Sequence, residues 1–130
     1  MSTQVIHTGL APAAIGPYSQ AVSVTLDSAE KLVFCSGQIG LDPATGNLRG
    51  GFEAQVDQAL ANLQAVIAAA NGNLGGIVKL TLFLTDLGNF ATVNAKMEAL
   101  LNKPYPARST VGVASLPKGA LFEIEAIVAI

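Results

Sequence analysis

Apolar residues recur along the chain at two different spacings, which separate predicted helices from predicted strands. From residue 52 to residue 70 they recur every three or four positions, which predicts an amphipathic helix that ends at Asn71, with Gly72 as its C-terminal stop. Residues 86–89 can cap a second helix, which ends before Pro104 because a proline disfavours helix in the residue that precedes it. The apolar side of this second helix carries Phe90, Val93, Met97, Leu100 and Leu101.

Shorter stretches rich in apolar and β-branched residues predict strands before and between the helices. They cover residues 5–6, 21–26, 31–39 and 77–85, with a turn at residues 27–30. The nearly continuous apolar run at residues 31–39 predicts a strand that is buried on both faces. Within it, Cys35 is expected to be a small core residue and not a reactive thiol. Gly37 predicts a bulge, or a close approach by a ligand or another backbone.

Two β-rich runs near the C-terminus, residues 106–114 and 122–128, are joined by a Pro/Gly turn and predict a hairpin. Because side chains alternate between the faces of a strand, the hairpin would gather four polar residues on one face, namely Arg108, Thr110, Glu123 and Glu125. Such a patch suits an anionic substrate held beside a group that handles water or protons. The structural alternative is that cross-strand Arg/Glu pairs only decorate the sheet, where each contributes about 0.2–1 kcal/mol.

The order of the elements predicts an α+β fold in a single domain, residues 1–130, with two helices covering one face of a mixed sheet. The uncovered face would carry either Lys79, Thr81 and Phe83 or Val78, Leu80 and Leu82. Only 12% of the residues are charged, against about 25% in an average soluble domain. Few charges and an uncovered sheet face together favour association of the chain with copies of itself.

Composition and charge exclude several classes of function. The net charge of -2 and an isoelectric point of about 5.2 argue against a phosphate-binding or nucleic-acid surface, which needs clustered Lys and Arg. Cys35 is the only cysteine and His7 the only histidine, which excludes an internal disulfide framework, a multi-cysteine zinc site and a His-rich metal site. A basic start followed by a long apolar run is absent, so a cytoplasmic location is expected.

Four segments, in this order along the chain, carry a resemblance to a known family. They are APAAIGPYSQ at 11–20, CSGQI at 35–39, FATVNA at 90–95, and a C-terminal set made of PARS at 106–109, LPK at 116–118 and EIEA at 123–126. Together they resemble the Rid family, the YjgF-type group of reactive-intermediate imine deaminases that is also described as L-PSP endoribonucleases. The resemblance covers almost the whole chain, and its C-terminal set is the most specific piece.

The resemblance implies a chorismate-mutase-like fold, assembled as a homotrimer with sites in the clefts between subunits. The activity it implies is hydrolysis of 2-imino acids, such as 2-iminobutanoate and 2-iminopropanoate, to 2-oxo acids and ammonia. Pyridoxal-phosphate enzymes such as threonine dehydratase release these imines. The resemblance implies that the reaction needs no cofactor and no metal.

By the same resemblance, Arg108 grips the substrate carboxylate through two parallel N–H···O bonds, and Glu123 positions water and accepts a proton. Family members also place around the ligand the residues that match Tyr18, Ser36, Gly37 and Asn94. Two positions depart from many relatives. Thr110 stands where many have cysteine, which keeps a small polar group in the site without a thiol, and Met97 stands where many have an aromatic residue.

Two other functions compete with the deaminase. The first is a non-catalytic trimer that senses a small carboxylate or 2-oxo acid, in which Arg108 would serve the same purpose. The second is the ribonuclease or translation-inhibitor activity attributed to some relatives, which the acidic isoelectric point and the absence of a basic stripe disfavour.

Overall fold

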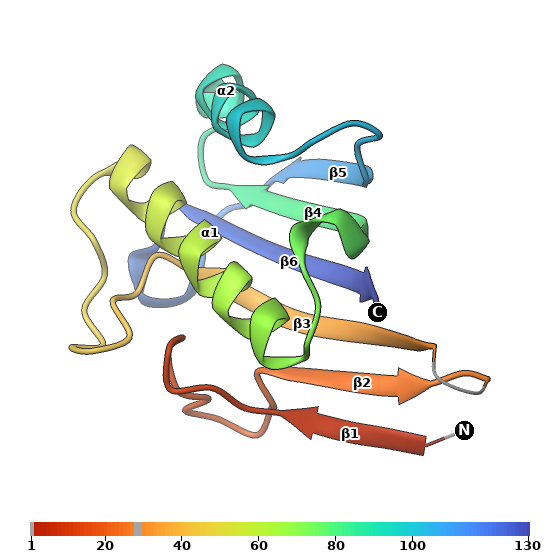
Figure 1. Cartoon of the computed structure of the whole chain (residues 1–130). Coiled ribbons are helices and arrows are strands. Elements are labelled where there is room, and N and C mark those ends of the chain that lie inside the picture. Colours follow the sequence, from red (N-terminus) through yellow and green to blue (C-terminus); the bar gives the residue numbers. More distant parts are fainter. Residues whose placement is uncertain (1, 28–29) are drawn as a thin grey trace.

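The computed structural model describes residues 2–27 and 30–130, so Ser28 and Ala29 of the predicted turn lie outside the described residues. In the described part, six strands form one mixed sheet in the order β1-β2-β3-β6-β4-β5, accompanied by two α-helices (Figure 1). The elements are β1 Ser2–Ile6, β2 Ala21–Thr25, β3 Lys31–Ile39, α1 Phe52–Ala69, β4 Ile77–Leu84, α2 Phe90–Leu100, β5 Ala107–Gly112 and β6 Phe122–Ala129. The predicted α+β class is therefore confirmed, and the predicted strands and helices agree with the structure to within a few residues.

The predicted C-terminal hairpin is wrong, because β5 and β6 do not pair. β4 lies between them, parallel to β5 and antiparallel to β6. The alternate residues of β4 and β6 are almost all buried and apolar, so both strands take inner positions, whereas β5 has exposed residues and lies at the edge. The connection at residues 113–121 is long enough to pass the end of β4, which a tight hairpin turn would not be.

Both helices cover the same face of the sheet, as predicted. α1 packs across β3 and β6, and α2 lies toward β4 and β5 (Figure 1). The core between the layers contains Val33 and Cys35 of β3, alternate residues of β4 and β6, and the inner faces of both helices. Lys96 of α2 joins the two helices through ion pairs with Glu53 and Asp57 of α1. Cys35 is a buried core residue, as expected, and burial raises the pKa of its thiol to about 11.

Among the described residues, no helix covers the opposite face of the sheet, and Lys79, Thr81 and Phe83, one of the two alternative sets predicted for it, lie on that face. Phe34 of β3 also lies there, with 47% of its surface exposed, so the predicted burial of β3 on both faces is wrong for a single chain. The reason is that both helices occupy the other side. A sheet face with exposed apolar side chains such as Phe34 is a surface that another chain can cover.

Two local predictions concern glycines, one inside β3 and one after α1. Gly37 does mark a bulge, because the register between β3 and β6 shifts between Cys35 and Gln38. The left-handed residue that ends α1 is Asn71, with φ of 67°, and not Gly72. Asparagine tolerates this conformation, and the Gly72 N–H then donates to the Ile67 carbonyl at 3.0 Å, which closes the last turn.

Candidate functional site

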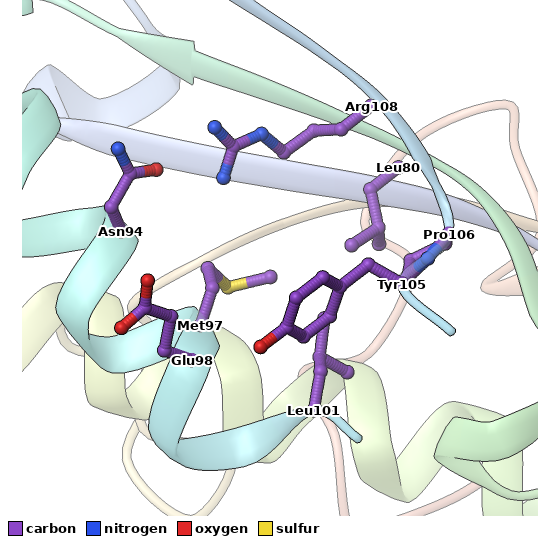
Figure 2. Close-up of a pocket in the computed structure, with 8 residues that line it drawn as sticks. All are labelled: Leu80, Asn94, Met97, Glu98, Leu101, Tyr105, Pro106 and Arg108. Carbon is purple, nitrogen blue, oxygen red and sulfur yellow. The ribbon is translucent and has the colours of Figure 1, made fainter. Parts of the chain in front are cut away.

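The first of two clefts lies between α2 and β5, and we call it the arginine cleft. It has a volume of about 340 Å³ and is lined by Leu80, Asn94, Met97, Glu98, Leu101, Tyr105, Pro106 and Arg108. Figure 2 shows Arg108 reaching toward Asn94 across the mouth of the cleft, with Met97 and Leu101 below. A cationic group thus stands at the entrance of a space with an apolar floor, an arrangement that suits a small carboxylate with an apolar side chain.

Arg108 owes its orientation to the start of α2. Its guanidinium carbon lies 5.4 Å from the centre of the Phe90 ring, a cation–π contact that joins β5 to α2. Among the described residues, Arg108 forms no ion pair with any carboxylate, although Glu98 lines the same cleft. Its five N–H donors are therefore available to a bound anion.

Thr110 follows Arg108 two residues later on the same face of β5, next to buried Leu82 of β4. Its hydroxyl oxygen is buried, and no group in the described part of the chain hydrogen-bonds to it. A buried hydroxyl without a partner is costly, so this oxygen is suited to a bond with a ligand or with another chain. The role of Thr110 in binding substrate stays a prediction.

The second cleft lies at the end of β3, and we call it the glutamate cleft. It has a volume of about 720 Å³ and contains four of the predicted site residues, Tyr18, Ser36, Gly37 and Glu123. The loop at 12–20, the loop at 38–46 and the turn at 117–118 supply the rest of its lining. Gly37 is required here, because a Cβ atom at this position would collide with the Glu123 carboxylate.

The carboxyl group of Glu123 lies in an unusual electrostatic setting. Burial raises its pKa above the ordinary glutamate value, and the negative charge of Glu125 raises it further. No cation forms an ion pair with it among the described residues. A carboxylate with a raised pKa beside an open cleft is a candidate general base, since it takes a proton from water more readily than an ordinary glutamate does.

Buried amide side chains hold the loops around the glutamate cleft. Gln20 accepts from the Thr8 N–H at 2.7 Å and donates to the Pro12 carbonyl at 2.8 Å, which holds the first loop. Asn62 of α1 donates to the carbonyls of Ile39 and Leu41 at 3.1 and 2.8 Å, which holds the second. Hydrogen bonds from buried side chains therefore fix the loops that form the walls of the cleft.

The structure does not bring all the predicted site residues together. Arg108 pairs with Leu80, which pairs in turn with Ala126, so Arg108 lies on the helix-covered side of the sheet. Glu123 lies beside Phe83 on the opposite side, and Glu125 shares that side. The predicted single patch of four polar residues is wrong, because the insertion of β4 gives β5 and β6 registers that a direct hairpin would not.

The structure divides the predicted site residues between two clefts. Arg108 and Asn94 line the arginine cleft, with Thr110 two residues beyond Arg108 on β5, and the other four line the glutamate cleft. Reasoning from sequence missed the contact of Phe90 with Arg108 and the presence of Lys118 in the glutamate cleft. In the sequence, the turn at Pro117–Gly119 was the feature that could have pointed to Lys118. In the structure, Lys118 takes a left-handed conformation in this turn, with φ of 58°.

The described residues contain no group of three or more His, Cys, Asp or Glu side chains arranged to hold a metal ion. Of the helices in residues 2–27 and 30–130, none combines the length and apolarity that crossing a membrane requires.

Comparison with known proteins gives consistent matches over nearly the whole chain. The family described as Endoribonuclease L-PSP matches residues 8–130. The chain is 48% identical to the 2-iminobutanoate/2-iminopropanoate deaminase of Salmonella typhimurium, with 96% of each chain covered. It is also 48% identical to Protein DfrA of Myxococcus xanthus, covering 98% of this chain and 95% of that one. The crystal structure of RidA from Psychrobacter sp. PAMC 21119 superposes with a TM-score of 0.89 at 48% identity, over 98% of this chain and 99% of the other.

Proposed function

The chain belongs to the Rid family and has its chorismate-mutase-like fold, and on this premise we propose that it hydrolyses 2-imino acids to 2-oxo acids and ammonia. The observation that carries the proposal is the Arg108 guanidinium, which stands without a carboxylate partner among the described residues at the mouth of a small apolar cleft. Relatives that are 44%, 48% and 45% identical to this chain are named 2-iminobutanoate/2-iminopropanoate deaminase. The preferred substrates are then 2-iminobutanoate, 2-iminopropanoate and close analogues.

The active site is assembled between subunits of a homotrimer. Arg108 and Glu123 lie on opposite sides of one sheet, so one chain does not present both to a ligand as small as an imino acid. A second copy resolves this, if its glutamate cleft faces the arginine cleft of the first. The two clefts are different surfaces of the chain, so the contact is head-to-tail, and such contacts close into rings.

The arginine cleft of one subunit and the glutamate cleft of the next are the two half-sites of this shared site, and each has a distinct task in the reaction. Arg108 binds the substrate carboxylate through paired N–H···O bonds, and Asn94 and Thr110 lie beside it to hydrogen-bond polar atoms of the substrate. Across the interface, Tyr18, Ser36 and Gly37 form the wall of the cleft that holds Glu123. The substrate is reactive in itself, so correct placement of water supplies much of the rate.

The chemical steps balance without a cofactor. The substrate reacts as its protonated imine. Glu123 takes a proton from water while the oxygen attacks the imine carbon, which converts the C=N bond to a C–N bond and gives a neutral tetrahedral amino alcohol. Glu123 returns that proton to nitrogen, the C–N bond breaks, and ammonia leaves as the C=O bond forms and Glu123 takes the hydroxyl proton. The net change is one protonated imine and one water converted to one ketone, one ammonia and the proton that the imine carried. The raised pKa of Glu123 suits both the acceptance and the return of the proton.

A coupled assay tests the activity. Threonine dehydratase with threonine generates 2-iminobutanoate, and semicarbazide traps the imine that is not hydrolysed. The wild type is expected to accelerate formation of 2-oxobutanoate over the spontaneous rate, and Arg108→Ala is expected not to. Lys103→Ala is the matched control, because it removes a positive charge from an exposed residue outside both clefts. No acceleration by a trimeric wild type would reject the deaminase proposal.

Subunit mixing tests the shared site. Arg108→Ala and Glu123→Gln are each expected to be inactive alone, whereas trimers that contain both variants hold one interface with an intact Arg108 and an intact Glu123. Random mixing in equal amounts should recover about a quarter of wild-type activity. No recovery in mixed trimers, verified by mass, would place both residues of a working site in one chain.

The same variants separate the enzyme from a carboxylate sensor. The Glu123→Gln protein is expected to keep binding 2-oxobutanoate while it loses turnover, because the Arg108 contact remains. A protein that binds the oxo acid but never accelerates imine hydrolysis, in any variant, would be a sensor.

A further inference from the structure

We propose that the apolar floor of the arginine cleft receives the substrate's side chain, and that Met97 sets the length of side chain the protein accepts. The inference rests on the proposed function. It names the substrate class as 2-imino acids with long unbranched apolar side chains, such as those derived from norleucine and methionine, in addition to the shortest members.

The cleft has two chemically different ends. Arg108 and Asn94 stand at its mouth, whereas the floor consists of Leu80, Met97 and Leu101, whose exposed fractions are 1%, 5% and 8%. A carboxylate held by Arg108 fixes one end of an imino acid. Its imine carbon must then face the mouth, where the neighbouring subunit's water-handling half-site lies. The remaining direction for the side chain is toward the floor (Figure 2).

The volume of the cleft exceeds what the shortest substrates need. At about 340 Å³ it lies within the range of pockets that bind small molecules, whereas the side chain of 2-iminopropanoate is a single methyl group. Each further methylene that leaves water for this floor should strengthen binding by about fourfold. The gain should continue until the side chain reaches Met97 and Leu101.

Met97 is suited to set this limit. Its side chain is unbranched and flexible, so it adapts to side chains of different length without leaving a void. It projects from α2 into the space between Leu80 and Glu98 (Figure 2). A phenyl ring at the same position would be rigid and larger, and would fill the floor.

The charge at the rim excludes another class of substrate. Glu98 lines the cleft, the three floor residues carry no charge and no hydrogen-bond donor, and the donor beside them is the neutral Tyr105 hydroxyl (Figure 2). A second carboxylate, as in the imine derived from glutamate, would have to leave water beside Glu98 and among apolar groups, which is costly. We therefore expect acidic side chains to be rejected.

The test uses one source of imines for the whole series. A flavin-dependent L-amino-acid oxidase generates the imines of alanine, 2-aminobutyrate, norvaline, norleucine and glutamate, and semicarbazide competition measures how strongly the protein accelerates the hydrolysis of each. The wild-type kcat/KM is expected to rise with chain length by about fourfold per methylene. It is expected to be lowest for the glutamate imine.

Substitutions at Met97 should then change the longest substrate side chain that the cleft accepts, in opposite directions. Met97→Phe should lower the norleucine-to-alanine ratio of kcat/KM by about tenfold, and Met97→Ala should extend activity to the imine of phenylalanine. Ala99→Phe is the control, because it adds the same ring at an exposed position of α2 outside the cleft. Equal thermal midpoints and trimer masses are required of every variant compared, and the two Met97 variants serve as independent tests if one folds poorly.

The outcomes separate this inference from the proposed function. A wild type that hydrolyses the alanine imine but shows no rise with chain length overturns the inference alone. A Met97→Phe variant that lowers the rate for every imine by the same factor also overturns it. Failure of the wild type on all imines, including that of alanine, overturns both.

Discussion

The guanidinium of Arg108 lies over the ring of Phe90, with 5.4 Å between the guanidinium carbon and the ring centre. Arg108 is on the edge strand β5 and Phe90 is the first residue of α2, so the contact joins the two elements that form the arginine cleft. An arginine on an edge strand is otherwise free to adopt many rotamers. The ring restricts the guanidinium to positions that face the cleft.

Replacing Phe90 should therefore weaken substrate binding more than it slows the chemical step. Phe90→Leu removes a contact of about 0.5–1 kcal/mol and should raise KM by roughly two- to fivefold, with a smaller change in kcat. Phe90→Tyr keeps the aromatic face and should restore KM. Steady-state kinetics with 2-iminobutanoate provides the measurement, and a Phe90→Tyr protein as impaired as Phe90→Leu would contradict the role of the ring.

The activity should depend on pH through Glu123. Glu123 acts as a base when ionised, so kcat/KM should fall as the pH drops through its pKa, which burial and then Glu125 hold above the ordinary value. Glu125→Gln removes the repelling charge. Ionised Glu123 becomes easier to form, its pKa falls, and the acid limb moves to lower pH.

The pH profile of kcat/KM, corrected for spontaneous hydrolysis at each pH, measures this shift. Glu30→Gln removes an exposed carboxylate elsewhere and should leave the profile in place. If the acid limb of the kcat/KM profile stays fixed or moves to higher pH in Glu125→Gln, a group other than Glu123 controls the loss of activity at low pH.

Gly37→Ala should displace Glu123 without unfolding the protein. The new Cβ would occupy the space of the Glu123 carboxylate, so that side chain must swing away from the bulge of β3. Loss of position at a catalytic group costs about 10²-fold in rate, so we expect kcat to fall by about that factor.

Gly50→Ala is the control for this substitution, because a Cβ at Gly50 meets no atom within 4 Å. Circular dichroism should give the same spectrum for both variants. Full activity in Gly37→Ala would mean that Glu123 does not act from the position seen here.

Gln55 should contribute to stability by linking three segments. Its side chain is buried, donates to the Arg49 carbonyl at 3.0 Å, and accepts from the Leu121 N–H at 2.8 Å, just before β6 begins. Gln55→Leu leaves both backbone groups without this partner, which costs about 1–3 kcal/mol for each group that stays buried. Urea unfolding should give a lower midpoint, while Gln64→Leu, on the exposed side of α1, should change it little. An unchanged midpoint for Gln55→Leu would mean that water replaces both bonds.

The sequence by itself determined the secondary-structure elements of this protein and its family. The spacing of apolar residues predicted both helices and most strands, because helical and strand periodicities differ. Gly37 predicted the bulge, because glycine weakens the interior of a strand and often marks a bulge there. The motifs that carry the family resemblance predicted a set of site residues, of which Tyr18, Ser36, Gly37 and Glu123 line one cleft.

Only the tertiary structure decided how those residues are divided between the two clefts. A local rule pairs neighbouring strands, but the burial of alternate apolar residues drew β4 between β5 and β6. That non-local pairing set the registers, and with them the faces on which Arg108 and Glu123 lie. Side-chain alternation specifies which residues of one strand share a face. Which face of the sheet they occupy depends on partners far away in the sequence, and no short stretch of the chain contains that information.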